Sequence, residues 1–187
     1  MTENMTKNMT KNITKIIFSG YGGQGVLTLG QIVASIAMNK GKEVTWMPSY
    51  GAEMRGGTAN CAVIISDKPI GSPVVASNID ILVAMNEASI IKFEENVKED
   101  GYIFVNSSLI LNPIKHKGKV NIEATNIAAK VGNTRVANMV MLSGFLKKTD
   151  LFTLEDVEQI LNEKFKTRRP ELIPLNLEAI KEGMNTI

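Results

Sequence analysis

The stretch FSGYGGQGVLTLG, residues 18–30, contains five glycines directly after the β-prone residues 15–18. Gly20, Gly22 and Gly25 match the pattern G-x-G-x-x-G, which is typical of a tight turn between a strand and a helix. Such a turn exposes backbone N–H groups at the start of the helix, where the dipole favours an anion. The stretch therefore predicts the first strand–turn–helix unit of an α/β domain, with the turn as a candidate binding element.

Strands and helices alternate along the rest of the chain. The predicted strands are residues 15–19, 43–47, 60–66, 79–84, 102–105 and 119–123, and the predicted helices are residues 24–40, 87–98, 125–131, 134–147, 154–165 and 176–183. The strands are continuously apolar rather than alternating, which favours a mostly parallel sheet covered on both faces. We expect an α/β fold: one three-layer Rossmann-like domain over residues 14–187, with helices on both faces. Residues 1–13 repeat a polar four-residue unit and are expected to form a disordered tail.

Composition excludes several classes of function. The 187 residues carry a net charge of +2 and only 5% aromatic residues, which argues against nucleic acid or an anionic membrane as partner. The sequence shows no signal peptide and no apolar run of membrane-spanning length, so we expect a cytoplasmic protein. The single cysteine, Cys61, excludes an intramolecular disulfide and a cluster held by several cysteines of this chain, and we expect it to be a small buried side chain. The single histidine, His116, is expected to be an ordinary surface residue, because zinc sites and Ser-His triads have little support here.

The first glycine turn is open to three interpretations. A dinucleotide site needs an acidic residue at the end of the second strand, but that strand ends in residues 46–49, WMPS, and Glu43 lies at its start. A nucleoside triphosphatase needs a lysine and a hydroxyl where this chain has Val26 and Leu27. In the third interpretation, Gly23 and Gly25 only allow close packing of the strand against the helix.

A second glycine-rich stretch, MPSYGAEMRGGT, covers residues 47–58. It follows the second strand, so in a parallel sheet it lies at the same edge as the first turn. Arg55 offers a planar fork for a carboxylate or phosphate, and Glu53 is placed to orient it or to bind a partner chain. Tyr50 is of the amphipathic kind found at interfaces. The alternative is a surface loop whose charges are simply solvated.

These motifs resemble a known family. GYGGQG at 20–25 and PSYGAEMRGG at 48–57 are similar to the gamma subunit of 2-oxoacid:ferredoxin oxidoreductases. Residues 65–67, 138–142 and 176–183 extend the resemblance, together with Ile70 and Pro73, so that it covers most of residues 15–183. One departure is Ser143, which precedes Gly144 at a position where the family often has glycine. Both residues are small, so we expect close helix packing to survive.

The resemblance implies a multi-subunit enzyme that decarboxylates a 2-oxoacid, forms acyl-CoA and reduces ferredoxin. It implies alpha and beta subunits and a ferredoxin-like delta subunit as partners, with ferredoxin as electron acceptor of the complex. Thiamine diphosphate, magnesium, an iron–sulfur cluster and CoA are implied for the assembled complex, and no cofactor for this chain alone, which is expected to be inactive when isolated. The form SYGAEMRGG at residues 49–57 resembles the 2-oxoglutarate or branched-chain types more than the pyruvate type.

The resulting site prediction contains no catalytic and no metal-binding residue. We expect the two glycine stretches to form the CoA side of the site or a subunit interface, and a role in docking alone stays open. The residues are Gly20, Gly22, Gly23, Gln24, Gly25, Tyr50, Gly51, Glu53, Arg55, Gly56 and Gly57. The alternative function is a free-standing Rossmann-type NAD(P)-binding protein.

Overall fold

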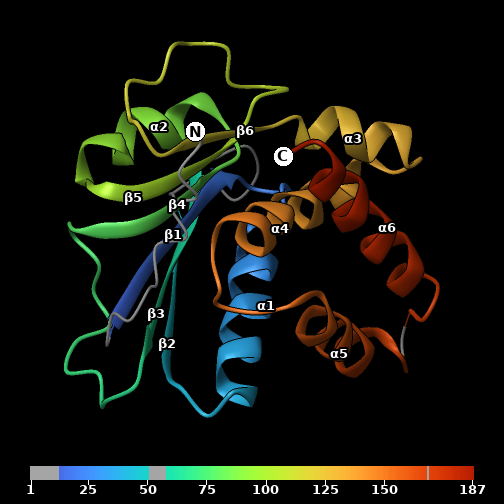
Figure 1. Ribbon diagram of the computed structural model, residues 1–187, viewed down its shortest axis with the longest axis horizontal. Helices are drawn as coiled ribbons and strands as arrows, with labels where there is room; N and C mark the ends of the chain where they lie inside the picture. Colours follow the sequence, from blue (N-terminus) through green and yellow to red (C-terminus); the bar gives the residue numbers. More distant parts are fainter. Residues whose placement is uncertain (1–12, 51–57, 168) are drawn as a thin grey trace, which may run out of the picture.

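The computed structural model describes residues 13–50, 58–167 and 169–187. Within these residues six strands form one sheet in the order β2-β3-β1-β4-β5-β6 (Figure 1). The strands are β1 (Ile13–Tyr21), β2 (Glu43–Tyr50), β3 (Thr58–Ser66), β4 (Ile79–Ala84), β5 (Val97–Asn106) and β6 (Lys119–Ile122). Strands β1, β4, β5 and β6 pair in parallel, whereas β3 lies between β1 and β2 and is antiparallel to both. The predicted α/β sheet is confirmed, with β3 running against the other described strands.

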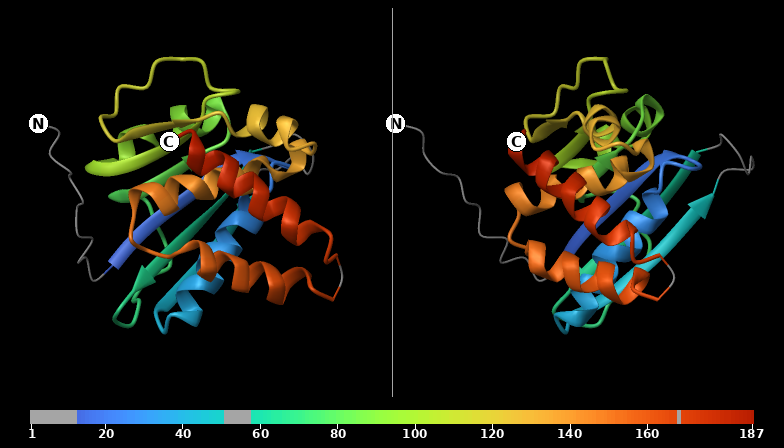
Figure 2. Two further views of the ribbon diagram at one scale, coloured as in Figure 1. Left: turned by 45° about the vertical axis from the view of Figure 1, so that its right-hand side comes forward. Right: turned by 90° about the vertical axis from the view of Figure 1, so that its right-hand side faces the viewer.

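Helices cover both faces of the sheet, unevenly. On one face lie α1 (Val26–Asn39), α3 (Ala124–Lys130), α4 (Ala137–Lys148), α5 (Leu154–Phe165) and α6 (Leu172–Asn185) (Figures 1 and 2). Helices α1 and α4 contact the strands, while α5 packs on α1, and α3 and α6 pack on α4. The other face carries the shorter α2 (Glu87–Phe93) and the segment 107–118. Two 3₁₀ turns, η1 (Glu94–Asn96) and η2 (Thr134–Val136), follow α2 and precede α4. In the described part of the chain, no helix is both long and apolar enough to cross a membrane.

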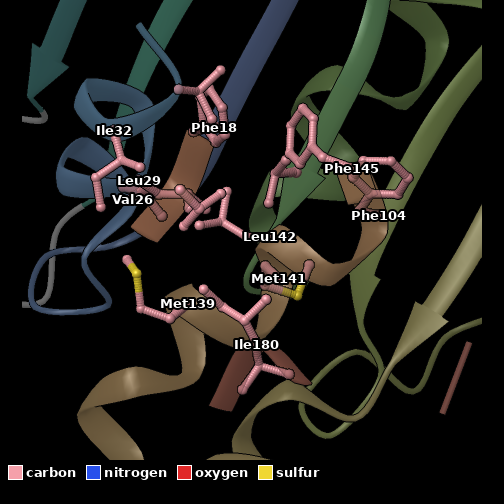
Figure 3. Close-up of a cluster of buried hydrophobic side chains, with 14 of the residues drawn as sticks. Phe18, Val26, Leu29, Ile32, Phe104, Met139, Met141, Leu142, Phe145 and Ile180 are labelled. Carbon is pink, nitrogen blue, oxygen red and sulfur yellow. The ribbon is translucent and has the colours of Figure 1, made fainter. Parts of the chain in front are cut away.

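The larger core lies under α1 and α4. Phe145 of α4 lies between Phe18 of β1 and Phe104 of β5 (Figure 3). Its ring centroid is 5.9 Å from that of Phe18 and 5.0 Å from that of Phe104, and Leu29 of α1 belongs to the same cluster. All four side chains are 0% exposed. The buried residues of α1, Leu29 among them, therefore form the contact that fixes α1 on the sheet.

Helix α4 is enclosed on two sides. Residues 137–145 are all buried, and α6 crosses over the helix (Figure 2). A Cβ atom on Gly144 would lie 2.8 Å from the Phe104 ring, and one on Gly183 of α6 would lie 2.7 Å from Ser143 Oγ. The Ser143 hydroxyl donates to the Val140 carbonyl at 2.6 Å, so the serine fits where the resemblance predicted glycine. Small residues thus let α4 approach β5 and α6 closely, as expected.

Several predicted boundaries are wrong. Strand β2 continues through Pro48 to Tyr50, because β2 is an edge strand and pairs only with β3, where Pro48 is opposite Cys61. The helix predicted over 87–98 ends at Phe93, and β5 already begins at Val97. Strand β1 begins at Ile13, which the sequence assigned to the tail, and residues 1–12 lie outside the described residues.

The single cysteine and the single histidine differ in outcome. Cys61 is 0% exposed, as predicted; its Sγ donates to the Val26 carbonyl at 3.6 Å, and burial raises the pKa of its thiol to about 12. His116 is half-buried rather than an ordinary surface residue. Its Nδ1 accepts from the Gly118 amide at 3.1 Å, and its Nε2 lies 2.8 Å from the Lys98 carbonyl, so the ring joins β5 to the segment before β6.

Candidate functional site

The side chain of Gln24 fastens the first glycine turn to the sheet. Its Oε1 accepts from the Tyr21 amide at 2.7 Å, and its Nε2 donates to the Met85 carbonyl at 3.2 Å. The turn is therefore tied to the ends of β1 and β4 together. A Cβ atom on Gly20 would lie 2.7 Å from Gln24 Oε1 and 2.9 Å from the Met85 Cβ. Glycine at position 20 leaves the space that this bridge needs.

Gly25 serves a second attachment, between α1 and α4. Its φ of 74° lies in the left-handed region. The Asn138 Nδ2 donates to the Gly25 carbonyl at 3.2 Å, while its Oδ1 accepts from the Met139 amide. A Cβ atom at position 25 would lie 2.4 Å from Asn138 Nδ2. Gly25 is therefore shaped by packing against α4, and not by packing of the first strand against the first helix as the third interpretation had it.

Gly23 is different, because its open side faces away from the protein. Its φ is 97°, and no described atom lies within 4 Å of the place where a Cβ would stand. Its neighbour Gly22 is also exposed in the turn. Packing does not account for Gly23, and its backbone is accessible to a ligand or to another chain.

The turn lies between two neighbouring parallel strands, β1 and β4, whose following helices cover opposite faces of the sheet. Helix α1 leaves β1 toward one face, and α2 leaves β4 toward the other (Figure 1). Such a switch point opens a crevice at the carboxyl ends of the strands, which is where open α/β sheets bind ligands. A cavity of about 230 Å³ lies at this edge. Its described lining residues are Gly23, Gln24, Met85, Leu109, Thr125, Thr134, Arg135 and Ala137.

The chemistry of this cavity suits an anion. None of its described lining residues is acidic, and Arg135 takes part in no ion pair among the described residues. The Thr125 hydroxyl is held by the Asn106 Nδ2 at 3.0 Å. A guanidinium beside glycine backbone amides is the donor set that phosphate and carboxylate groups prefer.

The second glycine stretch begins and ends at the same edge, as predicted. Tyr50 ends β2 opposite Ala59, and Thr58 begins β3 opposite Tyr21, the last residue of β1. The backbone of Tyr50 therefore lies at the carboxyl end of β2, at the same edge as the first glycine turn. The residues Gly51, Glu53, Arg55, Gly56 and Gly57 lie outside the described residues, and their roles stay predictions.

Arg135 was missed by sequence reasoning. It lies in the short turn that leads into α4, where the positive end of the helix dipole disfavours a cation. An arginine at this kind of position is a signal for an anionic ligand, but only when the strand ends beside it are known.

The geometry speaks against a dinucleotide site. That site needs the second strand beside β1 and parallel to it, so that an acidic residue at its end reaches the ribose. Here the antiparallel β3 occupies that place, and β2 lies two strand spacings from β1, about 10 Å. Glu43 begins β2 at the opposite edge of the sheet from the turn.

The family model described as pyruvate ferredoxin/flavodoxin oxidoreductase matches residues 15–186. The chain belongs to this family. Among its relatives, the ketoisovalerate oxidoreductase subunit VorA of Methanothermobacter thermautotrophicus is 36% identical over 88% of this chain. The 2-oxoglutarate synthase subunit KorC of Methanocaldococcus jannaschii is 34% identical over 78% of this chain and 80% of its own length. The match covers only 34% of VorA, so this family domain corresponds to about a third of that longer relative.

Solved structures agree with the family assignment. The gamma subunit of a keto/oxoacid ferredoxin oxidoreductase from Geobacter sulfurreducens is 31% identical, with a TM-score of 0.76 over 92% of this chain and 96% of that one. The fold also recurs, at 22% identity and a TM-score of 0.83, in the 2-oxoglutarate:ferredoxin oxidoreductase from Magnetococcus marinus. That match covers 95% of this chain and 32% of that one. The resemblance to gamma subunits of this family is confirmed.

Proposed function

We propose that this chain is the gamma subunit of a cytoplasmic, CoA-dependent 2-oxoacid:ferredoxin oxidoreductase, and that its cavity binds an anionic part of CoA. The observation that carries the proposal is the cavity at the first glycine turn, whose described lining includes Arg135 and Gly23 and no acidic residue. The complex would convert a 2-oxoacid and CoA to acyl-CoA and CO₂ while reducing ferredoxin. The Magnetococcus marinus structure holds 2-oxoglutarate, CoA and succinyl-CoA, which supports CoA as the ligand class.

The cavity fits a part of CoA rather than the whole molecule. Its volume of about 230 Å³ is below the roughly 300–1,000 Å³ of pockets that enclose a drug-sized ligand. It suits a phosphate or diphosphate group, which Arg135 would hold through its guanidinium and the Gly23 backbone would approach closely. The remainder of CoA would then lie against another subunit.

The chemical step is assigned to partner chains. No group of three or more histidine, cysteine or acidic side chains that could hold a metal occurs among the residues the structure describes, and the described residues that line the cavity include no carboxylate or imidazole base. We propose that alpha and beta subunits supply the thiamine diphosphate and magnesium sites. A ferredoxin-like delta subunit would carry iron–sulfur clusters. The gamma chain binds and orients CoA and is inactive alone.

The preferred substrate is 2-oxoglutarate, with a branched-chain 2-oxoacid as second candidate. The stretch at residues 49–57 supports these two types over pyruvate. The relatives do not choose among the substrates, because they include ketoisovalerate and 2-oxoglutarate types and also gamma subunits common to pyruvate and ketoisovalerate oxidoreductases, so the preference rests on residues 49–57. The free-standing NAD(P)-binding alternative gains no support from the family match, and the strand order argues against it.

The first test is purification of the complex from its own cells through a tag on this chain. Dye reduction is assayed with a panel of 2-oxoacids, with and without CoA. CoA-dependent activity with 2-oxoglutarate or a branched-chain acid supports the proposal and selects the substrate. A solitary chain without such activity that binds NAD(H) would replace it with the alternative.

The second test addresses the cavity. Arg135→Ala should raise the KM for CoA about 10- to 100-fold, since a hydrogen bond to a charged group is worth about 1.5–3 kcal/mol. The KM for the 2-oxoacid should not change, and Arg135→Lys should recover part of the loss. Arg169→Ala, which removes an arginine that does not line the cavity, is the matched control. An unchanged KM for CoA in a fully assembled Arg135→Ala complex would contradict the assignment.

A further inference from the structure

A fully buried amide side chain lies behind the lining of the candidate cavity. Asn106, the last residue of β5, is 0% exposed. Its Oδ1 accepts from the Thr125 amide at 3.4 Å, while its Nδ2 donates to the Thr125 hydroxyl at 3.0 Å and, at a longer 3.5 Å, to the Met85 carbonyl. Thr125 and Met85 both line the cavity. Asn106 is therefore placed to orient groups of the cavity wall without touching a ligand itself.

Backbone groups decide which way this amide points. A backbone N–H can only donate, and a backbone carbonyl can only accept. The Thr125 amide therefore requires the Oδ1 of Asn106 on its side, and the Met85 carbonyl requires the Nδ2 on the other. Exchange of the two ends would set two donors against each other and two acceptors against each other. The Asn106 side chain thus has one favourable orientation.

This orientation settles the role of the Thr125 hydroxyl. Because the Nδ2 of Asn106 donates to it, the hydroxyl oxygen is an acceptor in that bond and keeps its own hydrogen for another partner. No acceptor for this hydrogen occurs among the residues the structure describes. Thr125 is half-buried and lines the cavity, so a ligand there is the partner that can accept the hydrogen bond.

The surroundings of Thr125 favour an anionic acceptor. Helix α3, which carries Thr125, packs beside η2, which carries Arg135, and both residues line the same cavity. The described lining includes no acidic residue that would compete for the hydroxyl. A hydrogen bond from a hydroxyl to an ionised oxygen is shorter and stronger than one to a neutral oxygen. The bond that Thr125 receives from Asn106 polarises the hydroxyl further in the same direction.

A shared acceptor joins this wall to the first glycine turn. The Met85 carbonyl accepts from the Nε2 of Gln24 at 3.2 Å as well as from the Nδ2 of Asn106. Gln24 fastens the glycine turn, and Asn106 fastens Thr125, so the two sides of the cavity are held at the end of β4. Donors fixed before the ligand arrives need no reorganisation when it binds.

We propose that Thr125 donates its hydroxyl hydrogen to an anionic oxygen of a phosphate group of CoA, and that Asn106 is the positioning residue that directs this hydrogen into the cavity. The inference rests on the proposed function, in which Arg135 holds the same group. Thr125 is then a binding residue, and Asn106 acts only through it.

The first test compares Thr125→Val with Thr125→Ser in the complete complex. Valine keeps the shape of threonine but removes the hydroxyl, whereas serine keeps the hydroxyl. Thr125→Val should raise the KM for CoA about 10-fold or more and leave kcat and the KM for the 2-oxoacid unchanged, while Thr125→Ser stays near wild type. Thr28→Val is the matched control, because Thr28 is half-buried in α1 and is not among the described lining residues. Its KM for CoA should not change.

The second test addresses Asn106 with a double-mutant cycle. Asn106→Ala should raise the KM for CoA in the wild-type background but add little in the Thr125→Val background, because the hydroxyl that Asn106 positions is already gone. A purely structural role would move the KM equally in both backgrounds. Assembly is checked by co-purification. Where Asn106→Ala prevents assembly, calorimetric binding of CoA to the Thr125→Val and Thr125→Ser complexes decides the role of Thr125.

The outcomes separate this inference from the proposed function. An unchanged KM for CoA in Thr125→Val, beside a raised KM in Arg135→Ala, overturns the inference and keeps the proposed function. An unchanged KM in both variants overturns both. A loss in Thr125→Ser as large as that in Thr125→Val shows that the hydroxyl is not the cause and overturns the inference. Additive losses in the cycle overturn the positioning role of Asn106.

Discussion

The substitution Gly25→Ala tests whether the first glycine turn is shaped by packing against α4. Gly25 combines a φ of 74° with a carbonyl that accepts from Asn138 Nδ2 at 3.2 Å. Alanine at this position is strained by the left-handed conformation, and its Cβ would lie 2.4 Å from Asn138 Nδ2. Gly41 is the matched control, because its φ is 73° and no described atom lies within 4 Å of its Cβ position.

The two costs can be separated in magnitude. The left-handed conformation costs a residue other than glycine about 1–2 kcal/mol, and this is the whole cost expected for Gly41→Ala. Gly25→Ala also displaces the Asn138 amide and loses its hydrogen bond, which is worth about 1 kcal/mol. The expected loss in the free energy of unfolding is therefore roughly 2–3 kcal/mol for Gly25→Ala.

The assay is urea unfolding followed by the fluorescence of Trp46, the single tryptophan of the chain. In an Asn138→Ala background the amide is gone, and the remaining Cβ of residue 138 stands 3.4 Å from the new methyl group, an ordinary contact. The additional cost of Gly25→Ala should then fall to that of Gly41→Ala. Equal costs for both glycines in the wild-type background, or an excess that persists without Asn138, would refute the reasoning.

Three further predictions concern the rest of the fold. Gly30→Ala should lower the free energy of unfolding by about 1–3 kcal/mol despite the better helix propensity of alanine, because its Cβ would lie 2.4 Å from Cys61 Sγ. In urea unfolding, the additional substitution Cys61→Ala should restore most of this lost stability. Since burial raises the pKa of Cys61 to about 12, the folded chain should not react with a thiol reagent at pH 8 and should react once unfolded; rapid labelling of the folded chain would contradict this. Desolvation raises the pKa of Asp156, but hydrogen bonds from Lys40 and the Thr153 amide outweigh it, so the pKa lies below the ordinary value of 3.8. Asp156→Asn should thus lose on the order of 0.5–1 kcal/mol near pH 7, and in melts from pH 7 to pH 2 its difference from wild type should begin to shrink near the ordinary pKa of 3.8 and disappear only as the pH falls through the lower pKa of the folded state.

The sequence predicts most elements because their local signals are strong. The predicted bounds 79–84 and 154–165 coincide with β4 and α5, and α5 begins with a capping box between Thr153 and Asp156. The direction of β3 did not follow from its apolar run, because a strand buried on both faces reads alike in either direction. Its signal was the short connection of residues 51–57, since a parallel crossover needs about a dozen residues or more.

Only the part of the candidate site that is local in sequence could be predicted. The turn from Gly20 to Gly25 is visible in the sequence, since glycine spacing reports backbone conformation. Its tertiary partners are not, because Met85 lies 61 residues from Gln24, and Asn138 lies 113 residues from Gly25. Arg135 reaches the cavity by the same long-range packing. Asn138 carried part of the family resemblance, and the structure supplies a physical reason for it: the amide ties the start of α1 to α4.

The enclosure of α4 has a consequence for how the domain opens. A helix with nine successive buried residues cannot exchange its amide hydrogens through surface fluctuations, so its amides should exchange only when a covering element detaches. The element that covers it is α6, at the end of the described chain and in contact through Gly183. Peeling of α6 is therefore the expected first step of sub-global opening, and a partner that holds α6 in place would slow exchange in α4 without touching it.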